Sequence, residues 1–149
     1  MFFARGVLET VKKLRWTPDI IHCQGWISHL LPLYLKKAYK DDPIFTDSKI
    51  VLSLYDEIMD DKLPADFKDK LLFGNIEPSD VGLDDNVTGT QLAQLAIRYS
   101  DGVILGSDKL PESIVKSVSE SGLPVLPYDA AKVADGSYIE DYNSFYDQF

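Results

Sequence analysis

The sequence is poor in the residues that build cross-links, metal sites and membrane spans. It contains one cysteine, Cys23, so no disulfide can form within the chain. Two histidines bring the total of Cys and His side chains to three, fewer than the four ligands of a structural zinc site. No apolar run approaches the roughly 20 residues that cross a bilayer, and charged residues interrupt the apolar N-terminal segment. We therefore expect a protein of the reducing cytoplasm, with no membrane partner.

Positive charge is also scarce, with 15 Lys and Arg against 24 Asp and Glu, a net charge of −9. This balance argues against a nucleic-acid partner, because sequence-independent binding needs cations to neutralise phosphates. Residues 1–40 are the exception, with 7 basic and 2 acidic residues, while the remainder holds 8 and 22. The first 40 residues can present a basic face to an anionic ligand or to the acidic remainder, although solvated helix surfaces commonly produce such runs.

Hydrophobic patterning predicts strands that alternate with amphipathic helices. Short apolar runs indicate strands at 19–23, 49–55, 102–107 and 123–128. Apolar residues at helical spacing indicate helices at 2–14, 27–39, 90–101 and 110–122. Pro32 either lies inside the second of these helices and kinks it, or stands in the first turn of a helix that begins there.

This order predicts one α/β domain over residues 1–149, a Rossmann-like parallel sheet with helices on both faces. Because the chain opens on a helix, we expect the first strand or strands of the sheet to be missing. Residues 56–88 form a polar, irregular excursion whose clearest helix is at 65–73, and long excursions of this kind are often functional. Residues 129–149 form an acidic, aromatic tail helix.

Ligands bind such sheets at the carboxyl ends of the strands, where several polar residues follow the predicted strands. His22 and Cys23 are neighbours on a strand and point to opposite faces, so they do not form a nucleophile–base pair, and His29 lies on the next helix. A dense acidic cluster can hold a divalent cation, act as acid and base, or simply begin a helix. Its members are Asp56, Glu57, Asp60 and Asp61.

Two further features have a structural and a functional interpretation. Gly106 and Ser107 do not form a phosphate loop but can ease a strand-to-helix turn, and Ser107 or Asp108 can cap a helix at Lys109 or Leu110. The tail aromatics have the spacing of a buried helix face, and they can alternatively stack on sugar faces or dock on a partner. These aromatics are Tyr138, Tyr142, Phe145 and Tyr146.

The stretch PDIIHCQGWISHLLPLYLKKAY, residues 18–39, resembles the N-terminal domain of starch and glycogen synthases, glycosyltransferase family 5. That family typically reads Pro-Asp, two β-branched residues and His, then Asp-Trp, and later Leu-Pro-x-Tyr-Leu. The matching positions are Pro18, Asp19, Ile20, Ile21, His22, Trp26, Leu31, Pro32, Tyr34 and Leu35. The stretches SKIVLSLYD and QLAQLAIRYSDGVILGSDKL are similar to later family segments, so the resemblance covers residues 2–121.

The resemblance implies one half of a two-Rossmann glycosyltransferase fold. Such enzymes move glucose from ADP-glucose or UDP-glucose to an α-1,4-glucan with retention of configuration and without a catalytic metal, and we expect no cofactor. The same resemblance implies that the N-terminal side of the substrate cleft is lined by His22, Gln24, Trp26, Tyr55 and Asp56. In a longer protein the partners would be an α-glucan and a nucleotide sugar.

The chain departs from the family pattern at this same edge. Gly25 replaces the Asp of Asp-Trp, Ile27 stands where His or Gln often follows, and Tyr55-Asp56 replaces His-Asn. The Lys-x-Gly-Gly loop and the nucleotide-sugar-binding C-terminal domain are also absent. Enzymes lower barriers by roughly 8–23 kcal/mol, largely through preorganised polar groups. We therefore assign no catalytic residue and predict that this chain alone does not transfer glucose; the alternative is a non-catalytic carbohydrate- or protein-binding, regulatory module.

Overall fold

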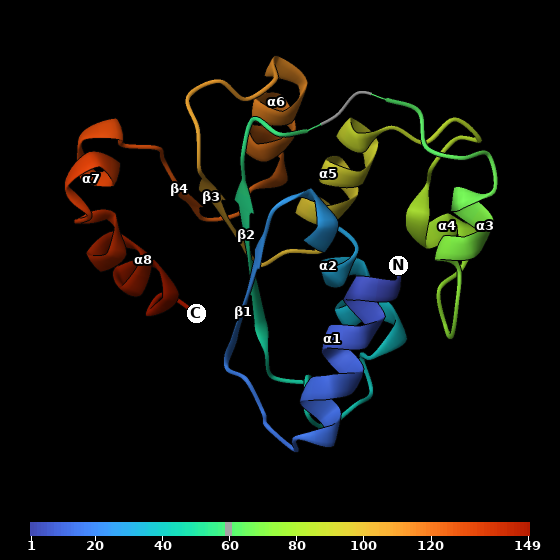
Figure 1. Cartoon of the computed structure of the whole chain (residues 1–149). Helices are drawn as coiled ribbons and strands as arrows, with labels where there is room; N and C mark the ends of the chain where they lie inside the picture. The colour runs from blue at the N-terminus through green and yellow to red at the C-terminus, as the bar shows by residue number, and fades with distance from the viewer. Residues whose placement is uncertain (59–60) are drawn as a thin grey trace.

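Four parallel strands form the centre of the computed structural model, which describes residues 1–58 and 61–149 (Figure 1). The strands β1 (Ile20–Gln24), β2 (Lys49–Leu54), β3 (Gly102–Leu105) and β4 (Val125–Leu126) pair in chain order. Right-handed crossovers between strands laid down in this order all fall on one face of the sheet. The predicted parallel α/β sheet is therefore confirmed, and its order explains why the connecting helices gather together.

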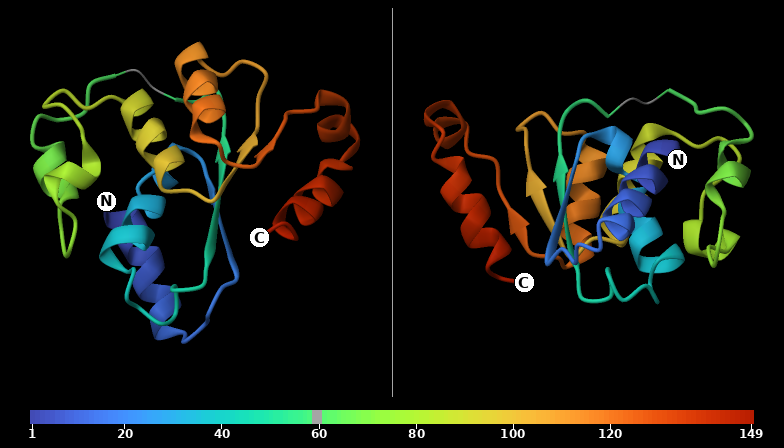
Figure 2. Two further views of the ribbon diagram at one scale, coloured as in Figure 1. Left: turned by 180° about the vertical axis from the view of Figure 1, so that it is seen from behind. Right: turned by 60° about the horizontal axis from the view of Figure 1, so that its bottom comes forward.

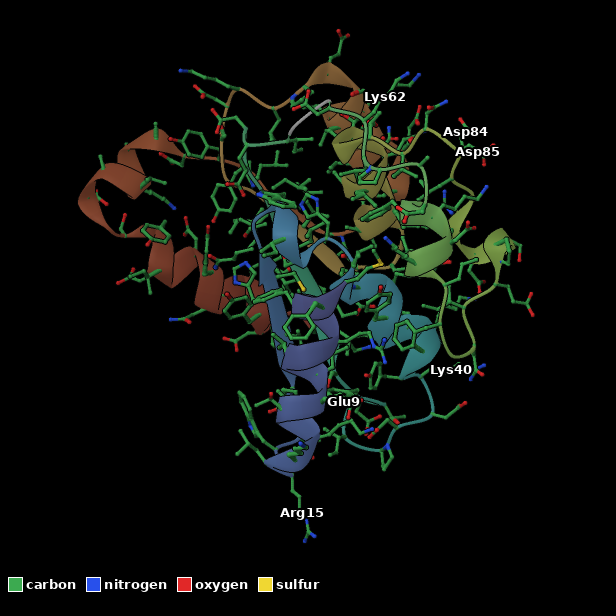
Figure 3. All side chains as sticks on the ribbon, turned by 45° about the vertical axis from the view of Figure 1, so that its right-hand side comes forward. Glu9, Arg15, Lys40, Lys62, Asp84 and Asp85 are labelled. Carbon is green, nitrogen blue, oxygen red and sulfur yellow. The ribbon has the colours of Figure 1, made fainter. Side chains whose placement is uncertain are left out.

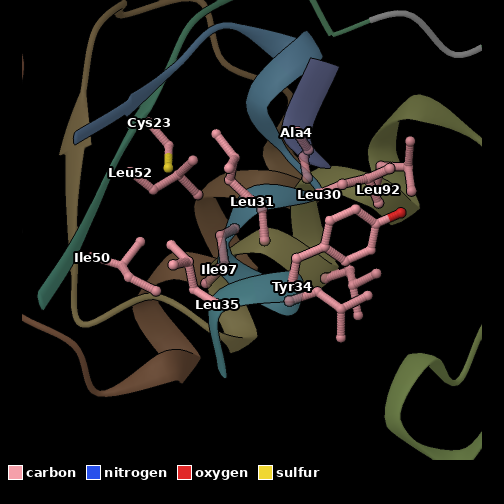
Figure 4. Packing of buried hydrophobic residues seen from close by; sticks show 14 of the residues in the cluster. Ala4, Cys23, Leu30, Leu31, Tyr34, Leu35, Ile50, Leu52, Leu92 and Ile97 are labelled. Carbon is pink, nitrogen blue, oxygen red and sulfur yellow. The ribbon is translucent and has the colours of Figure 1, made fainter. Parts of the chain in front are cut away.

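The main core lies between the sheet and these helices. The helices are α1 (Phe2–Lys13), α2 (Leu31–Leu33), α5 (Gly89–Arg98) and α6 (Glu112–Ser121). In Figure 4 the side chains of Leu31 and Leu35 lie beside Ile50 and Leu52 of β2. All four are at most 5% exposed, so the core on this side of the sheet is closed to water.

The predicted helix at 27–39 is three consecutive pieces. A 3₁₀ turn, η1 (Trp26–Ser28), precedes α2, and a π-helical turn, η2 (Tyr34–Ala38), follows it. Pro32 stands in the first turn of α2, where its missing N–H costs nothing. Of the two interpretations of Pro32, the one in which the helix begins there is correct.

The excursion after β2 contains two short helices, α3 (Phe67–Leu71) and α4 (Pro78–Val81). The helix expected at 65–73 spans only Phe67–Leu71 in the structure. Apolar side chains spaced along the excursion enter the main core. These anchors are Leu71, Ile76, Val81, Leu83 and Val87.

The tail is two helices, so the prediction of one helix over 129–149 is wrong. α7 (Ala130–Asp135) ends at Gly136, whose φ of 84° lies in the left-handed region that favours glycine, and α8 (Tyr138–Tyr146) follows. Figure 2 shows both helices on the side of the sheet opposite to the other helices. Phe145 of α8 is 3% exposed and packs on Val51 and Ile104. Helices therefore cover both faces, as predicted.

The turn before α6 also differs from expectation. The α6 helix begins at Glu112 with Pro111 as its N-cap residue. The Ser107 hydroxyl accepts a hydrogen bond from the Lys109 backbone N–H at 3.0 Å. Ser107 therefore closes a turn ahead of the helix, and the predicted cap at Lys109 or Leu110 is wrong.

The basic first 40 residues meet the acidic remainder through ion pairs. The N···O distances are 3.2 Å for Lys12–Asp42, 2.9 Å for Lys36–Asp101 and 2.7 Å for Lys37–Asp80. Figure 3 shows Arg15, Asp84 and Asp85 pointing away from the body of the protein. Some basic residues of the first 40 therefore face the acidic remainder, and others, such as Arg15, are exposed to solvent. Within residues 1–58 and 61–149, no helix has the length and apolarity needed to cross a membrane.

Candidate functional site

His22 is the centre of a hydrogen-bond network near the carboxyl end of β1. Its Nε2 lies 2.6 Å from Ser53 Oγ, and its Nδ1 lies 2.6 Å from the Tyr146 hydroxyl. The Gln24 side-chain amide nitrogen, a donor only, is 3.3 Å from the same Nδ1. A neutral imidazole has one donor and one acceptor nitrogen. Nδ1 is therefore the acceptor, and Nε2–H donates to Ser53.

Burial keeps this histidine neutral. Desolvation lowers the pKa of His22 to about 4, because the charged form loses its hydration between the sheet and α8. The rings of Tyr142 and Tyr146 each stand edge-on to the imidazole, with centroids 5.7 Å away. At neutral pH His22 thus offers no positive charge to an anionic substrate.

The turn after β1 is held by backbone geometry rather than by polar side chains. Gly25 has φ 77° and ψ 156°, a region that residues with a Cβ rarely enter. The Trp26 backbone N–H donates to Glu57 Oε1 at 3.2 Å. A Cβ built on Gly25 would lie 3.1 Å from that same oxygen. Any residue with a Cβ is therefore strained at position 25, and an Asp side chain does not fit this turn without rearrangement.

Tyr55 and Asp56 follow β2 and have different surroundings. The Tyr55 ring lies so close to Gly106 that a Cβ there would be 2.4 Å from Cε1. Gly106 thus makes room for an aromatic ring. From the sequence, Gly106 was expected only to ease a strand-to-helix turn. Asp56 is exposed. Of the five residues expected to line the cleft, only His22 and Gln24 are joined directly to one another.

Cys23 and His29 both lie on the side of the main core. Cys23 is 1% exposed, and burial raises the pKa of its thiol to about 12, so it stays an unreactive thiol. His29 is 3% exposed, and burial lowers its pKa to about 4. The expectation that His22 and Cys23 point to opposite faces is confirmed.

The acidic cluster after β2 shows no metal-binding arrangement in the described part of the chain. Glu57 accepts the Trp26 N–H, and Asp61 lies near Trp26 at the rim of a small apolar hollow. Asp60 lies outside the described residues. Across 1–58 and 61–149, no group of three or more Cys, His, Asp or Glu side chains is placed to hold a metal ion.

One residue of the site, Ser53, was missed from the sequence, whereas Glu57 and Tyr146 were named as candidates but their partners in the site were not predicted. Ser53 lies one strand away from His22, Glu57 is 31 residues from its partner Trp26, and Tyr146 is 124 residues from His22. Ser53 had a detectable signal, since parallel strands in register place it beside Gln24. The contact between Tyr146 and His22 had no signal in the sequence, because it depends on where the tail docks.

Comparison with known sequences agrees with the observed parallel α/β fold. A sequence model of the starch synthase catalytic domain matches residues 1–126. The chain belongs to the starch synthase catalytic domain family. The match includes all four strands and ends before α7, so the tail that supplies Tyr146 lies beyond it. The family resemblance of the sequence is thereby confirmed.

Two curated relatives are named glycogen synthase. The protein from Clostridium perfringens is 34% identical over 113 residues, covering 76% of this chain and 23% of the relative. The protein from Chlorobium limicola is 38% identical over 117 residues, covering 72% of this chain and 24% of the relative. The chain therefore spans about a quarter of the length of these relatives. No solved structure matches it.

Proposed function

We propose that this chain keeps the N-terminal architecture of a cytoplasmic glycogen or starch synthase but does not transfer glucose by itself. The observation that carries the proposal is that His22 is neutral and has both ring nitrogens hydrogen-bonded within the chain. A histidine held in this way has neither a positive charge nor an unbonded ring nitrogen to offer a substrate. In a longer protein, an α-glucan and a nucleotide sugar would be its ligands.

The turn beside His22 supports the same conclusion. Oxyanion-type catalysis needs preorganised donors or charges aimed at the reacting atoms. Here Gly25 supplies no side chain, and Trp26 and Ile27 present half-exposed apolar surfaces, at 48% and 49%. Removing one such donor from an enzyme typically costs about 10²–10³ in rate, and several family polar positions have changed here.

Transfer of radiolabel from ADP-glucose or UDP-glucose to glycogen tests the proposal directly. We expect no turnover above buffer for this chain, with a glycogen synthase assayed in parallel as the positive control. The Gly25→Asp variant should be equally inactive, because its backbone conformation does not accept the side chain. Robust turnover by the unaltered chain would show that the proposal is wrong.

A second candidate function is a non-catalytic carbohydrate-binding or regulatory module. It is favoured by a tyrosine-lined hollow between β4 and the tail helices, close to His22. Calorimetry against maltooligosaccharides and ADP tests it. Heat of binding with either ligand supports a module that kept ligand recognition. The absence of heat with both ligands would indicate that the chain has only a structural role.

A further inference from the structure

A hollow of about 270 Å³ lies at the carboxyl ends of β3 and β4, beneath the tail helices. We call this hollow the tail pocket, and its lining includes Tyr55, Asp129, Lys132, Tyr138, Asp141 and Tyr142. Its volume falls just below the roughly 300–1,000 Å³ of pockets that hold drug-sized ligands. It is therefore suited to a small ligand of one or two rings. Most of its polar lining comes from residues beyond the family match, which ends at residue 126.

Tyrosine rings form much of the wall of the tail pocket. Tyr138 and Tyr142 meet edge to face, with centroids 5.2 Å apart and planes at 73°. The ring of Tyr55 is held in place over Gly106, on the sheet side. Tyr rings combine a flat apolar face with a hydroxyl that can donate or accept. This composition matches a ligand that has apolar C–H faces and hydroxyl groups at its edge.

The charged groups of the pocket disfavour an anionic ligand. Lys132 is the single cation among the described lining residues, and its Nζ donates to both Asp141 oxygens at 2.9 and 2.7 Å. That ion pair raises the pKa of Lys132, so the ammonium stays charged and engaged. The Asp129 carboxylate adds a further negative charge. Asp129 Oδ1 accepts the Ala131 and Lys132 backbone N–H groups, which leaves lone pairs on its second oxygen. A phosphate would meet a net negative site, whereas hydroxyl groups can donate to the lone pairs that remain on the two carboxylates.

From these observations we propose that the tail pocket is a binding site for a neutral sugar. The sugar's C–H face lies on Tyr138 or Tyr142, and its hydroxyls donate to Asp129 and Asp141. The proposal rests on the ligand-binding module proposed above, and it adds where the ligand binds and which chemistry selects it. It requires no glucosyl transfer.

The pocket is also connected to the His22 network. Tyr142 forms the wall of the pocket on one side and contacts the His22 imidazole on the other. Burial, followed by the nearby Tyr55, raises the pKa of Tyr142 to about 12, so its hydroxyl remains a neutral donor at physiological pH. A sugar bound against Tyr142 would therefore lie one side chain away from the His22 imidazole.

Amide NMR of the ¹⁵N-labelled chain, titrated with maltose, tests the proposal. We expect saturable shifts at residues 128–138, with a millimolar dissociation constant appropriate to a shallow pocket. Inorganic phosphate and ADP should leave these signals unmoved. Tyr138→Ala should weaken maltose binding at least tenfold, and Ile139→Ala, a 55% exposed neighbour on the same helix, should not.

Asp141→Asn sharpens the test because it should change the binding of maltose and of phosphate in opposite directions. Loss of the carboxylate should weaken maltose binding, while release of Lys132 should allow phosphate to shift residues 128–138 for the first time. Dispersed spectra of each variant will show that the tail remains folded. If Asp141→Asn loosens the tail, the pair Tyr138→Ala and Ile139→Ala still decides the question.

Each contrary outcome has a definite meaning. Maltose shifts confined to residues 24–27 would overturn the tail pocket but leave the binding module standing. No response to maltose anywhere in the chain would overturn the tail pocket, and no response to ADP either would overturn the binding module as well. Shifts at residues 128–138 with ADP or phosphate in the unaltered chain would show that the pocket does not select neutral ligands.

Discussion

The two faces of the sheet are built in different ways. One face is covered by α1, α2, α5 and α6, and its strand residues join a continuous apolar core. The other face is covered by α8, and its buried hydrophobic cluster is Val51, Ile104 and Phe145, surrounded by half-buried tyrosines. The first face supplies stability, while the second brings hydroxyl groups and His22 together. The candidate sites thus lie where packing is thin and polar groups are tolerated.

The largest expected effect compares matched isoleucines on the two faces. Ile50 and Ile104 are each 1% exposed, but Ile50 belongs to the main core and Ile104 to the cluster under α8. We expect Ile50→Ala to cost about 4–5 kcal/mol and Ile104→Ala about 2–3 kcal/mol, because α8 can settle into the space left behind. Urea unfolding followed by circular dichroism measures both, and equal losses would contradict the distinction between the faces.

Detaching α8 should have a smaller effect. Phe145→Ala is expected to cost less than the roughly 3–5 kcal/mol of a Phe→Ala change in a closed core, because the tail can undock while the sheet survives. Hydrogen exchange should accelerate in residues 138–149 and stay slow in β2. Ile139→Ala, at an exposed site of α8, is the control. Loss of protection throughout the chain would show that the tail is integral to the core.

Acid should weaken the α8 face through His22. The unfolded chain takes up a proton near pH 6.5, while the folded His22 does so only near its pKa of about 4. The contribution of neutral His22 to the free energy of unfolding is therefore complete above pH 6.5. It is lost as the pH falls through the folded pKa, by on the order of 1–3 kcal/mol. His22→Gln should remove about half of the dependence between pH 6.5 and 4, because buried His29, whose pKa is also lowered to about 4, contributes the rest. An imidazole NMR midpoint near 6.5 in the folded protein would contradict this.

The smallest expected effect is the loss of one hydroxyl. Tyr146→Phe removes the donor to His22 Nδ1, a bond that stabilises the neutral imidazole. We expect a stability loss of about 0.5–1.5 kcal/mol and a raised His22 pKa, read from the same NMR titration. Tyr138→Phe, at a residue that lines the tail pocket, should leave the titration unchanged. An unaltered His22 midpoint in Tyr146→Phe would mean that the bond does not hold the imidazole neutral.

Much of the sheet could be predicted from local patterns. The apolar runs around Ile21, Ile50 and Val103 indicated buried parallel strands, and His22 and Cys23 were correctly placed on opposite faces. The tail was harder, because its helical pattern continues across Gly136 and only the observed φ of 84° divides it. Ser107 was likewise assigned to a helix that begins several residues later, at Glu112.

The candidate site divides in the same way. Its position at the carboxyl ends of the strands follows from chain order, and the family motif around His22 and Trp26 is legible in the sequence. The conformation of Gly25 could not be predicted from the sequence, because a glycine in a motif does not reveal which of its allowed backbone regions it occupies. The structure shows a turn that positions the Trp26 N–H on Glu57.

The sequence by itself determined the parallel sheet, the helices of the main face and the family, because these follow from periodicity and contiguous motifs. Only the tertiary structure decided what occupies the other face. The contact between Tyr146 and His22 joins residues 124 positions apart, and the tail pocket exists only once α7 and α8 have docked. Local patterning cannot specify such contacts, because their free energy depends on burial and geometry that are created when distant segments pack together.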